Sequence, residues 1–290
     1  MKIQKNILLF DKHQKPIATD IFFQETGQPK PVIIYAHGFN GFKDWGNFDQ
    51  MAKQIAAAGF VFIKFNFSFN GTTPDQPEAF VDLEAYAQNN YTKELDNLGA
   101  VIDWAEHPDN PYAAEMDGSK IGLIGHSLGG GIVLLKAAED ARVKALTTWA
   151  SIAECQTPWG SWPAAKMQEW RETGVQYIAN SRTNQQMPLG YQLYEDYEQS
   201  KSRLNIEQAI KSLYLPVLLC HGTDDPAVPV QKAYLLKEWQ PSATLFTVAS
   251  DHVFGRKHPW MSDDLPEPMA AVLGETIVFF QNAFLRKQVG

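Results

Sequence analysis

The sequence predicts an α/β fold built on a doubly wound, mostly parallel sheet. Short apolar segments rich in β-branched and aromatic residues, such as 30–36 and 143–149, alternate with longer segments whose apolar residues recur at helical spacing. Several short segments end in polar residues, as strands do at the ligand-binding edge of a parallel sheet. The 290 residues, of which 44% are hydrophobic, suit one large domain over residues 1–290.

The first third of the chain supplies the opening elements of this sheet. Residues 1–10 begin like a signal peptide, but Asp11 and Lys12 end the apolar run, so an edge strand is expected instead. Residues 30–36 are predicted to be the third strand. A stripe of apolar residues over 48–56 predicts a helix that Gly59 ends, and a strand should follow.

The rest of the chain continues the alternation, with 143–149 as the sixth strand. Strands are predicted at 60–66, 121–124, 143–149, 215–222 and 243–249, and helices at 95–102, about 130–138 and 273–284.

The most informative motif is Gly125-His-Ser-Leu-Gly129, which lies between the predicted strand 121–124 and a predicted helix. A Gly-x-Ser-x-Gly sequence in this context is typical of a nucleophile elbow, a sharp turn that holds the serine hydroxyl above a helix N-terminus. We therefore predict that Ser127 is a catalytic nucleophile.

A serine nucleophile needs a base, and the base needs an orienting carboxylate. In a hydrolase of this kind the chain order is serine, acid, histidine. Asp224 and Asp225 follow the predicted strand 215–222, and His252 follows the strand 243–249. Each residue is at a strand end and in the required order, which predicts a catalytic triad.

Four segments give the chain a family resemblance: His37–Trp45, Gly125–Gly130, His221–Pro229 and Asp251–Phe254. With these motifs it resembles the α/β-hydrolase superfamily, and within it the dienelactone-hydrolase-like and bacterial acyl-esterase branch. Dienelactone hydrolases carry a cysteine nucleophile, whereas this elbow carries Ser127. The resemblance therefore implies the α/β-hydrolase fold and chemistry on ordinary carboxylic esters.

The resemblance also selects between neighbouring candidates. The family pattern His-Gly-x-x-Asp-x-x-Val-Pro favours Asp225 as the acid, with Asp224 as a loop-capping alternative. The pattern Asp-His-x-Phe favours His252 as the base over His258, which is expected to be a polar turn residue.

Acyl transfer also requires an oxyanion hole, usually two backbone N–H groups. One is expected from Leu128, the residue after the nucleophile. By resemblance, the other comes from Phe39, after the third strand, where Gly38 would let the backbone approach the substrate.

About sixty residues separate the sixth strand from the next clear strand, which is more than one crossover helix needs. In the superfamily an insertion here forms a cap, so residues 151–213 are expected to be a helical cap. Its aromatic residues suggest either an apolar substrate pocket, with Trp159 and Trp162 as substrate-binding residues, or a packed cap core. Arg171, Arg182 and Arg203 are expected to be solvated.

Composition narrows the possible partners. A net charge of -8 without basic clusters argues against nucleic acid or an anionic membrane. Two cysteines in buried or inserted positions favour a reducing cytoplasm and no disulfide. No pair of histidines has metal-ligand spacing, so neither a metal nor a cofactor is expected.

The sequence thus predicts a serine hydrolase that cleaves a small carboxylic ester, including aryl or hydroxycinnamoyl esters, through an acyl-enzyme. A serine peptidase of the acyl-peptide or prolyl-oligopeptidase type is the alternative, and a non-catalytic hydrolase-like binding protein is a third reading.

Overall fold

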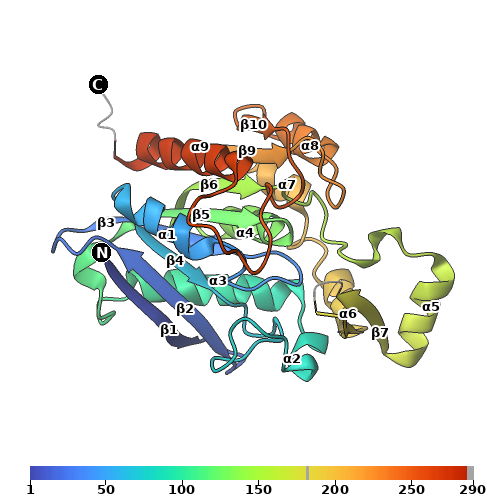
Figure 1. The fold of residues 1–290 in the computed structure, drawn as a ribbon. Coiled ribbons are helices and arrows are strands. Elements are labelled where there is room, and N and C mark those ends of the chain that lie inside the picture. Colours follow the sequence, from blue (N-terminus) through green and yellow to red (C-terminus); the bar gives the residue numbers. More distant parts are fainter. Residues whose placement is uncertain (181–182, 286–290) are drawn as a thin grey trace.

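The computed structural model describes residues 1–180 and 183–285 of the chain. Within these residues the main sheet has eight strands in the order β1-β2-β4-β3-β5-β6-β9-β10 (Figure 1). Their bounds are β1 (Lys2–Phe10), β2 (Pro16–Phe23), β3 (Lys30–Ala36), β4 (Val61–Phe65), β5 (Met116–His126), β6 (Val143–Trp149), β9 (Val217–Gly222) and β10 (Thr244–Val248).

The prediction that the strands of the sheet are mostly parallel is confirmed. The pairs β1–β2 and β2–β4 are antiparallel, and every other neighbouring pair is parallel. All residues of β3 and β4 are buried, which explains why both strands are mostly apolar rather than alternating, with Lys30 and Lys64 as their charged residues.

Helices connect the strands and flank the sheet. They are α1 (Phe48–Ala57), α2 (Leu83–Ala87), α3 (Tyr91–Glu106), α4 (Leu128–Glu139), α5 (Ala164–Thr173), α6 (Gln192–Gln199), α7 (Ile206–Lys211), α8 (Gln231–Trp239) and α9 (Glu267–Phe284). None of the helices in the described part of the chain has the length and apolar character needed to cross a bilayer.

Two glycines of β5 show that helices cover both faces. A Cβ built on Gly122 would lie 2.6 Å from the Phe280 ring of α9, whereas one built on Gly125 would lie 2.2 Å from the Gly129 carbonyl oxygen of α4. Because residues 122 and 125 point to opposite faces of the strand, α9 and α4 lie on opposite sides of the sheet. The fold is therefore doubly wound, as predicted.

Two predicted boundaries at the centre of the sheet differ from the structure. The strand expected at 121–124 extends from Met116 to His126, and the following helix begins at Leu128 rather than near Gly130. Ser127 alone separates the two elements, so the turn is sharper than the sequence pattern implied.

The segment between β6 and β9 is not purely helical, which corrects that part of the prediction. Besides α5 and α6 it contains an antiparallel pair, β7 (Val175–Asn180) and β8 (Gln185–Gly190), set to one side of the main sheet (Figure 1). Gln, Pro and Gly weaken the strand signal of β8, but the Trp170 indole donates to its Leu189 carbonyl at 2.7 Å. The last helix of the segment, α7, instead packs against α4 and α8.

Candidate active site

Ser127 occupies a strained turn between β5 and α4. Its backbone has φ 57° and ψ −120°, in a region that non-glycine residues seldom adopt. The flanking positions accept only glycine: a Cβ on Gly125 would meet the Gly129 oxygen, and one on Gly129 would lie 2.4 Å from the Ala36 oxygen. This is the geometry of a nucleophile elbow, and it holds the serine side chain clear of the sheet.

Asp225 and His252 meet above the carboxyl ends of β9 and β10. The His252 Nδ1 lies 2.7 Å from the Asp225 Oδ2. The other carboxylate oxygen, Oδ1, accepts the N–H groups of Ala227 and Val228, both at 2.8 Å. The His221 Nε2, which donates to the Val228 carbonyl, lies 3.3 Å from the Asp225 Oδ2. The sequence had given His221 no such role.

These contacts keep Asp225 ionised. Burial alone would raise the pKa of its carboxyl, but hydrogen bonds from His221, from His252 and from the Val228 N–H hold that pKa well below its ordinary value. A fixed carboxylate at Nδ1 makes that nitrogen the N–H donor, which leaves Nε2 of His252 free to accept a proton.

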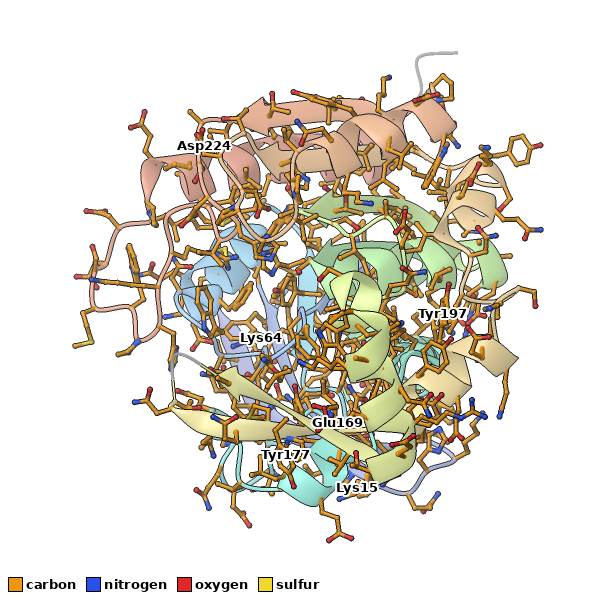
Figure 2. All side chains as sticks on the ribbon, turned by 90° about the vertical axis from the view of Figure 1, so that its right-hand side faces the viewer. Lys15, Lys64, Glu169, Tyr177, Tyr197 and Asp224 are labelled. Atoms are coloured by element: carbon orange, nitrogen blue, oxygen red, sulfur yellow. The ribbon has the colours of Figure 1, made fainter. Side chains whose placement is uncertain are left out.

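The two alternative residues lie in other surroundings. Asp224 is exposed and accepts a hydrogen bond from the Thr223 hydroxyl at 3.1 Å (Figure 2). His258 accepts the Gly46 N–H at its Nδ1, at 2.9 Å, and its ring packs edge-on against Phe42. The structure thus brings together Asp225 and His252 and places Asp224 and His258 elsewhere.

Ser127 and His252 line one pocket, which we call the Ser127 pocket. Five aromatic residues form much of its remaining wall: Tyr35, Phe39, Phe42, Trp45 and Phe48. Ser127 and His252 therefore face the same space.

The loop after β3 lies directly against the elbow. A Cβ on Gly38 would be 2.9 Å from the Ser127 Cβ and 3.0 Å from the His126 carbonyl oxygen, so this position requires glycine. The next residue, Phe39, and the first residue of α4, Leu128, line a common pocket beside Ser127. The two residues predicted to form the oxyanion hole are thus brought together.

Two buried histidines fix these loops in place. The His126 Nε2 donates to the His252 carbonyl oxygen at 2.9 Å, which ties the elbow to the loop that carries the base. Burial, together with the nearby His252 and Arg256, holds the pKa of His126 well below its ordinary value. Burial also lowers the pKa of His37 to about 4. Both rings are therefore neutral and structural.

Arg256 is a buried cation behind the Ser127 pocket that the sequence did not single out. Its Nε donates to the Val253 carbonyl at 2.8 Å, and its guanidinium lies 4.8 Å from the centre of the Phe48 ring. Its two terminal nitrogens have no hydrogen-bond partner among the described residues. Burial lowers its pKa to about 10, so it stays charged at neutral pH.

The predicted substrate-binding tryptophans lie in an aromatic cluster of the inserted segment. Trp159 and Trp162 both pack against Trp170, whose side chain is fully buried. Neither is among the described residues that line the Ser127 pocket or the neighbouring one. The packed-core alternative therefore describes these side chains. Tyr177, on β7, is exposed instead (Figure 2).

Of the three arginines expected to be solvated, Arg171 is exposed and Arg203 pairs with Glu139 at 2.8 Å. Arg182 lies outside the described residues.

A second pocket adjoins the oxyanion loop, and we call it the Glu94 pocket. Phe39 and Leu128 form its side next to Ser127, and six residues from α2, α3 and the loop between them also line it: Tyr86, Ala87, Asn89, Asn90, Tyr91 and Glu94. Leu189 and Leu193 of the inserted segment also line this pocket. No sequence motif marked this pocket.

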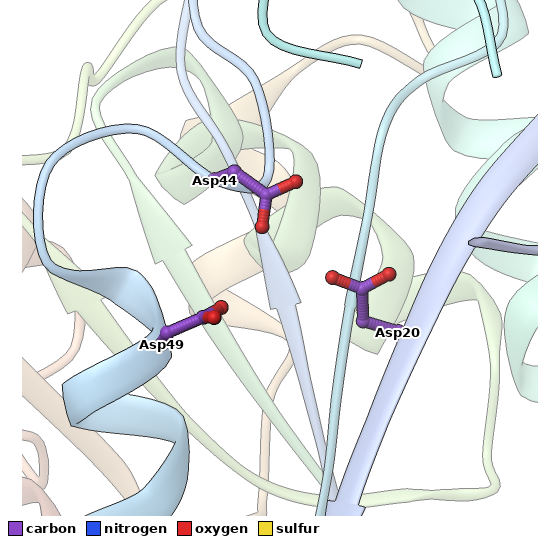
Figure 3. A group of neighbouring side chains, drawn as sticks. All are labelled: Asp20, Asp44 and Asp49. Carbon is purple, nitrogen blue, oxygen red and sulfur yellow. The ribbon is translucent and has the colours of Figure 1, made fainter. Parts of the chain in front are cut away.

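Three neighbouring carboxylates elsewhere in the fold, Asp20, Asp44 and Asp49, could by their spacing hold a cation (Figure 3). Lysine ammonium groups already neutralise them. The Lys43 Nζ lies 2.8 Å from Asp20, and the Lys64 Nζ lies 2.6 Å from Asp49 and also contacts Asp44. This cluster is a partly buried ion network, and none of its three carboxylates lines the Ser127 pocket.

Residues 19–158 match the dienelactone hydrolase family. The chain is 26% identical over 137 residues to the quorum-quenching protein AidA of Acinetobacter baumannii, a match that covers 47% of this chain and 40% of the relative. The matched stretch thus spans about two fifths of the length of that curated relative.

Solved structures resemble the chain over nearly its whole length. A putative hydrolase from Agrobacterium vitis superposes with a TM-score of 0.73 at 18% identity, covering 97% of this chain and 100% of that one. Est1E from Butyrivibrio proteoclasticus, solved with ferulic acid bound, gives a TM-score of 0.69 at 18% identity, again covering 97% and 100%. These similarities establish the fold.

Proposed function

Because the chain is an α/β hydrolase related to the dienelactone hydrolase family, we propose that it hydrolyses small carboxylic esters through an acyl-enzyme on Ser127. The observation that carries the proposal is the convergence of three strand ends. The strained Ser127 and the paired His252 line one pocket, and Asp225 is buried behind His252.

In the first half-reaction the Ser127 hydroxyl oxygen attacks the ester carbonyl carbon while its proton passes to Nε2 of His252. The charge that develops on the carbonyl oxygen is stabilised by the N–H groups of Phe39 and Leu128 and by the N-terminus of α4. The carbon–oxygen bond to the alcohol then breaks, and the imidazolium gives its proton to the departing oxygen. The alcohol leaves, and Ser127 is acylated.

In the second half-reaction water attacks the acyl carbon and gives a proton to the neutral His252. The bond to Ser127 breaks, the serine oxygen regains the proton, and the carboxylic acid is released. Asp225 remains ionised throughout and stabilises the transient imidazolium, so the cycle needs neither a metal nor a cofactor.

The two pockets fit the two halves of an ester. Since the protonated His252 must reach the leaving oxygen, the alcohol half belongs in the Ser127 pocket, where His252 lies. The acyl half then extends past Phe39 and Leu128 into the Glu94 pocket. We further propose that the segment 151–213 acts as a cap, because Leu189 and Leu193 help to enclose the Glu94 pocket.

A panel of para-nitrophenyl esters of rising acyl length, beside hydroxycinnamate esters and aminoacyl para-nitroanilides, tests the proposal. Turnover of esters without turnover of anilides is expected. Preferential cleavage of anilides would favour the serine peptidase, and the absence of all turnover together with the absence of labelling by a fluorophosphonate would favour a binding protein.

A further inference from the structure

Glu94 is a buried carboxyl group whose second oxygen has no partner. It lies on the first turns of α3 and lines the Glu94 pocket. Its Oε1 accepts a hydrogen bond from the Asn89 amide at 2.8 Å, while its Oε2 has no hydrogen-bond partner among the described residues. An unpaired polar atom in a buried site carries a large desolvation cost, so a ligand group that pairs with it gains affinity.

Asn89 leaves a complementary atom unpaired. Its amide nitrogen donates a hydrogen bond to Glu94, but its Oδ1 is buried and has no hydrogen-bond partner among the described residues. Asn89 lines the same pocket. The pocket therefore contains an unpaired amide oxygen beside an unpaired carboxyl oxygen.

Neighbouring polar side chains of the pocket have partners in the protein. The Tyr86 hydroxyl donates to the Asn40 side chain, and the Tyr91 hydroxyl accepts the Thr157 N–H at 2.9 Å. Within this set the unpaired atoms are thus confined to Asn89 and Glu94.

Glu94 is a hydrogen-bond donor at neutral pH. Burial raises the pKa of its carboxyl to about 8, because the accepted hydrogen bond from Asn89 only partly offsets the loss of water and the Asp196 carboxylate opposes ionisation. Four titratable groups face it: Tyr86 of α2, Tyr91 of α3, Cys155 of the loop after β6 and Asp196 of α6. Burial raises the pKa of the tyrosines and of the thiol, so these three stay neutral.

From this arrangement we infer that the Glu94 pocket selects esters whose acyl group carries a hydroxyl. The hydroxyl oxygen would accept the proton of the Glu94 carboxyl, and the hydroxyl hydrogen would be donated to the Asn89 Oδ1. A hydroxyl suits the pair because it both donates and accepts, whereas a methyl group at the same place would leave both atoms unpaired. This inference rests on the proposed esterase function and makes Glu94 a specificity-determining residue.

The test compares matched pairs of para-nitrophenyl esters that differ by one acyl hydroxyl. Butanoate is paired with β-hydroxybutanoate, hexanoate with ω-hydroxyhexanoate, and phenylpropanoate with para-hydroxyphenylpropanoate. The three pairs place the hydroxyl at three different distances from the ester carbonyl. For each pair the ratio of kcat/KM, hydroxylated over plain, is measured in the wild type, in Glu94→Gln and in Glu94→Leu.

The wild type should prefer the hydroxylated member of at least one pair by about tenfold. Glu94→Gln keeps a donor and should keep the preference, whereas Glu94→Leu should lose it, so that its kcat/KM for the hydroxylated ester is no higher than for the plain ester. In the wild type the ratio should also fall as the pH rises above about 8, because an ionised carboxylate no longer donates, and in Glu94→Gln it should stay constant.

Two outcomes would overturn the inference, and they are distinguishable from failure of the esterase proposal. If plain esters are hydrolysed but no pair shows a hydroxyl preference, or if Glu94→Leu keeps that preference, the inference is wrong and the esterase proposal stands. If the wild type hydrolyses no ester at all, both are wrong.

Discussion

The Asp225 carboxylate and the His252 imidazole form a buried pair, with Nδ1 2.7 Å from Oδ2 and the Asp225 side chain wholly inaccessible to solvent. Asp225 also accepts two backbone N–H groups of its own loop, which orient the carboxylate toward the histidine. The adjacent Asp224 points to solvent. The pair fixes both the tautomer and the orientation of His252, and it motivates the first prediction.

Asp225→Asn should lower kcat for ester hydrolysis by on the order of 10⁴-fold, because an amide at this position favours the wrong imidazole tautomer, as in serine proteases. Steady-state kinetics on a para-nitrophenyl ester measure the loss. Asp224→Asn is the matched control and should stay near the wild-type value. Equal losses in the two variants would show that the carboxylate acts through general charge rather than through His252.

His252→Ala should remove nearly all activity, whereas His258→Ala should retain kcat. His258 packs against Phe42 and accepts the Gly46 N–H, so its removal should instead cost about 1–2 kcal/mol of the free energy of unfolding. Urea denaturation and kinetics on the same preparations separate the two effects. A His258→Ala protein that is stable but inactive would contradict the assignment of the base.

Gly38→Ala should reduce kcat by on the order of 10²-fold while the fold is kept, because the added methyl group would press on Ser127 and displace the oxyanion loop. Gly274→Ala in α9 is the control, since a Cβ there meets nothing within 4 Å. It should leave kcat unchanged and add about 0.5–1 kcal/mol of stability through helix propensity. Unaltered kcat in Gly38→Ala would show that this loop does not form the oxyanion hole.

Glu94 should make the stability of the protein fall as the pH rises. Its carboxyl has a pKa of about 8 in the folded protein, against 4.5 as the ordinary value. Between these two values the folded protein retains a proton that the unfolded chain has released, so the free energy of unfolding decreases with pH. Glu94→Gln removes this contribution, so its stability relative to the wild type should rise across that range.

Urea denaturation at several pH values measures this difference, with Glu84→Gln as the control because Glu84 is exposed. The difference in free energy of unfolding between Glu84→Gln and the wild type should stay constant over the same pH range. If the difference between Glu94→Gln and the wild type is also independent of pH, Glu94 ionises in the folded protein as it does in the unfolded chain.

The elbow and the order of the triad could be predicted because they depend on local rules. The glycines flanking Ser127 report a turn in which a Cβ would clash, and Asp225 and His252 follow strands that the sequence pattern marks clearly. In a parallel sheet such strand ends necessarily lie on one edge. The sequence alone therefore constrained where these groups would meet.

The two pockets could not be predicted because they depend on packing between distant segments. Glu94 is one of several charged residues on α3, and Leu189 and Leu193 of the inserted segment, far from it in the sequence, line the same pocket. The tryptophans of that segment suggested either a substrate pocket or a packed cap core, and only the structure shows that Trp159 and Trp162 pack on Trp170.

The site of covalent modification by a fluorophosphonate shows directly whether Ser127 is the nucleophile. We predict that intact-mass spectrometry will show one adduct per chain, that peptide mapping will place it on Ser127, and that Ser127→Ala will bind none and lose ester hydrolysis while remaining folded. A modified residue other than Ser127, or full ester turnover by Ser127→Ala, would show that Ser127 is not the nucleophile.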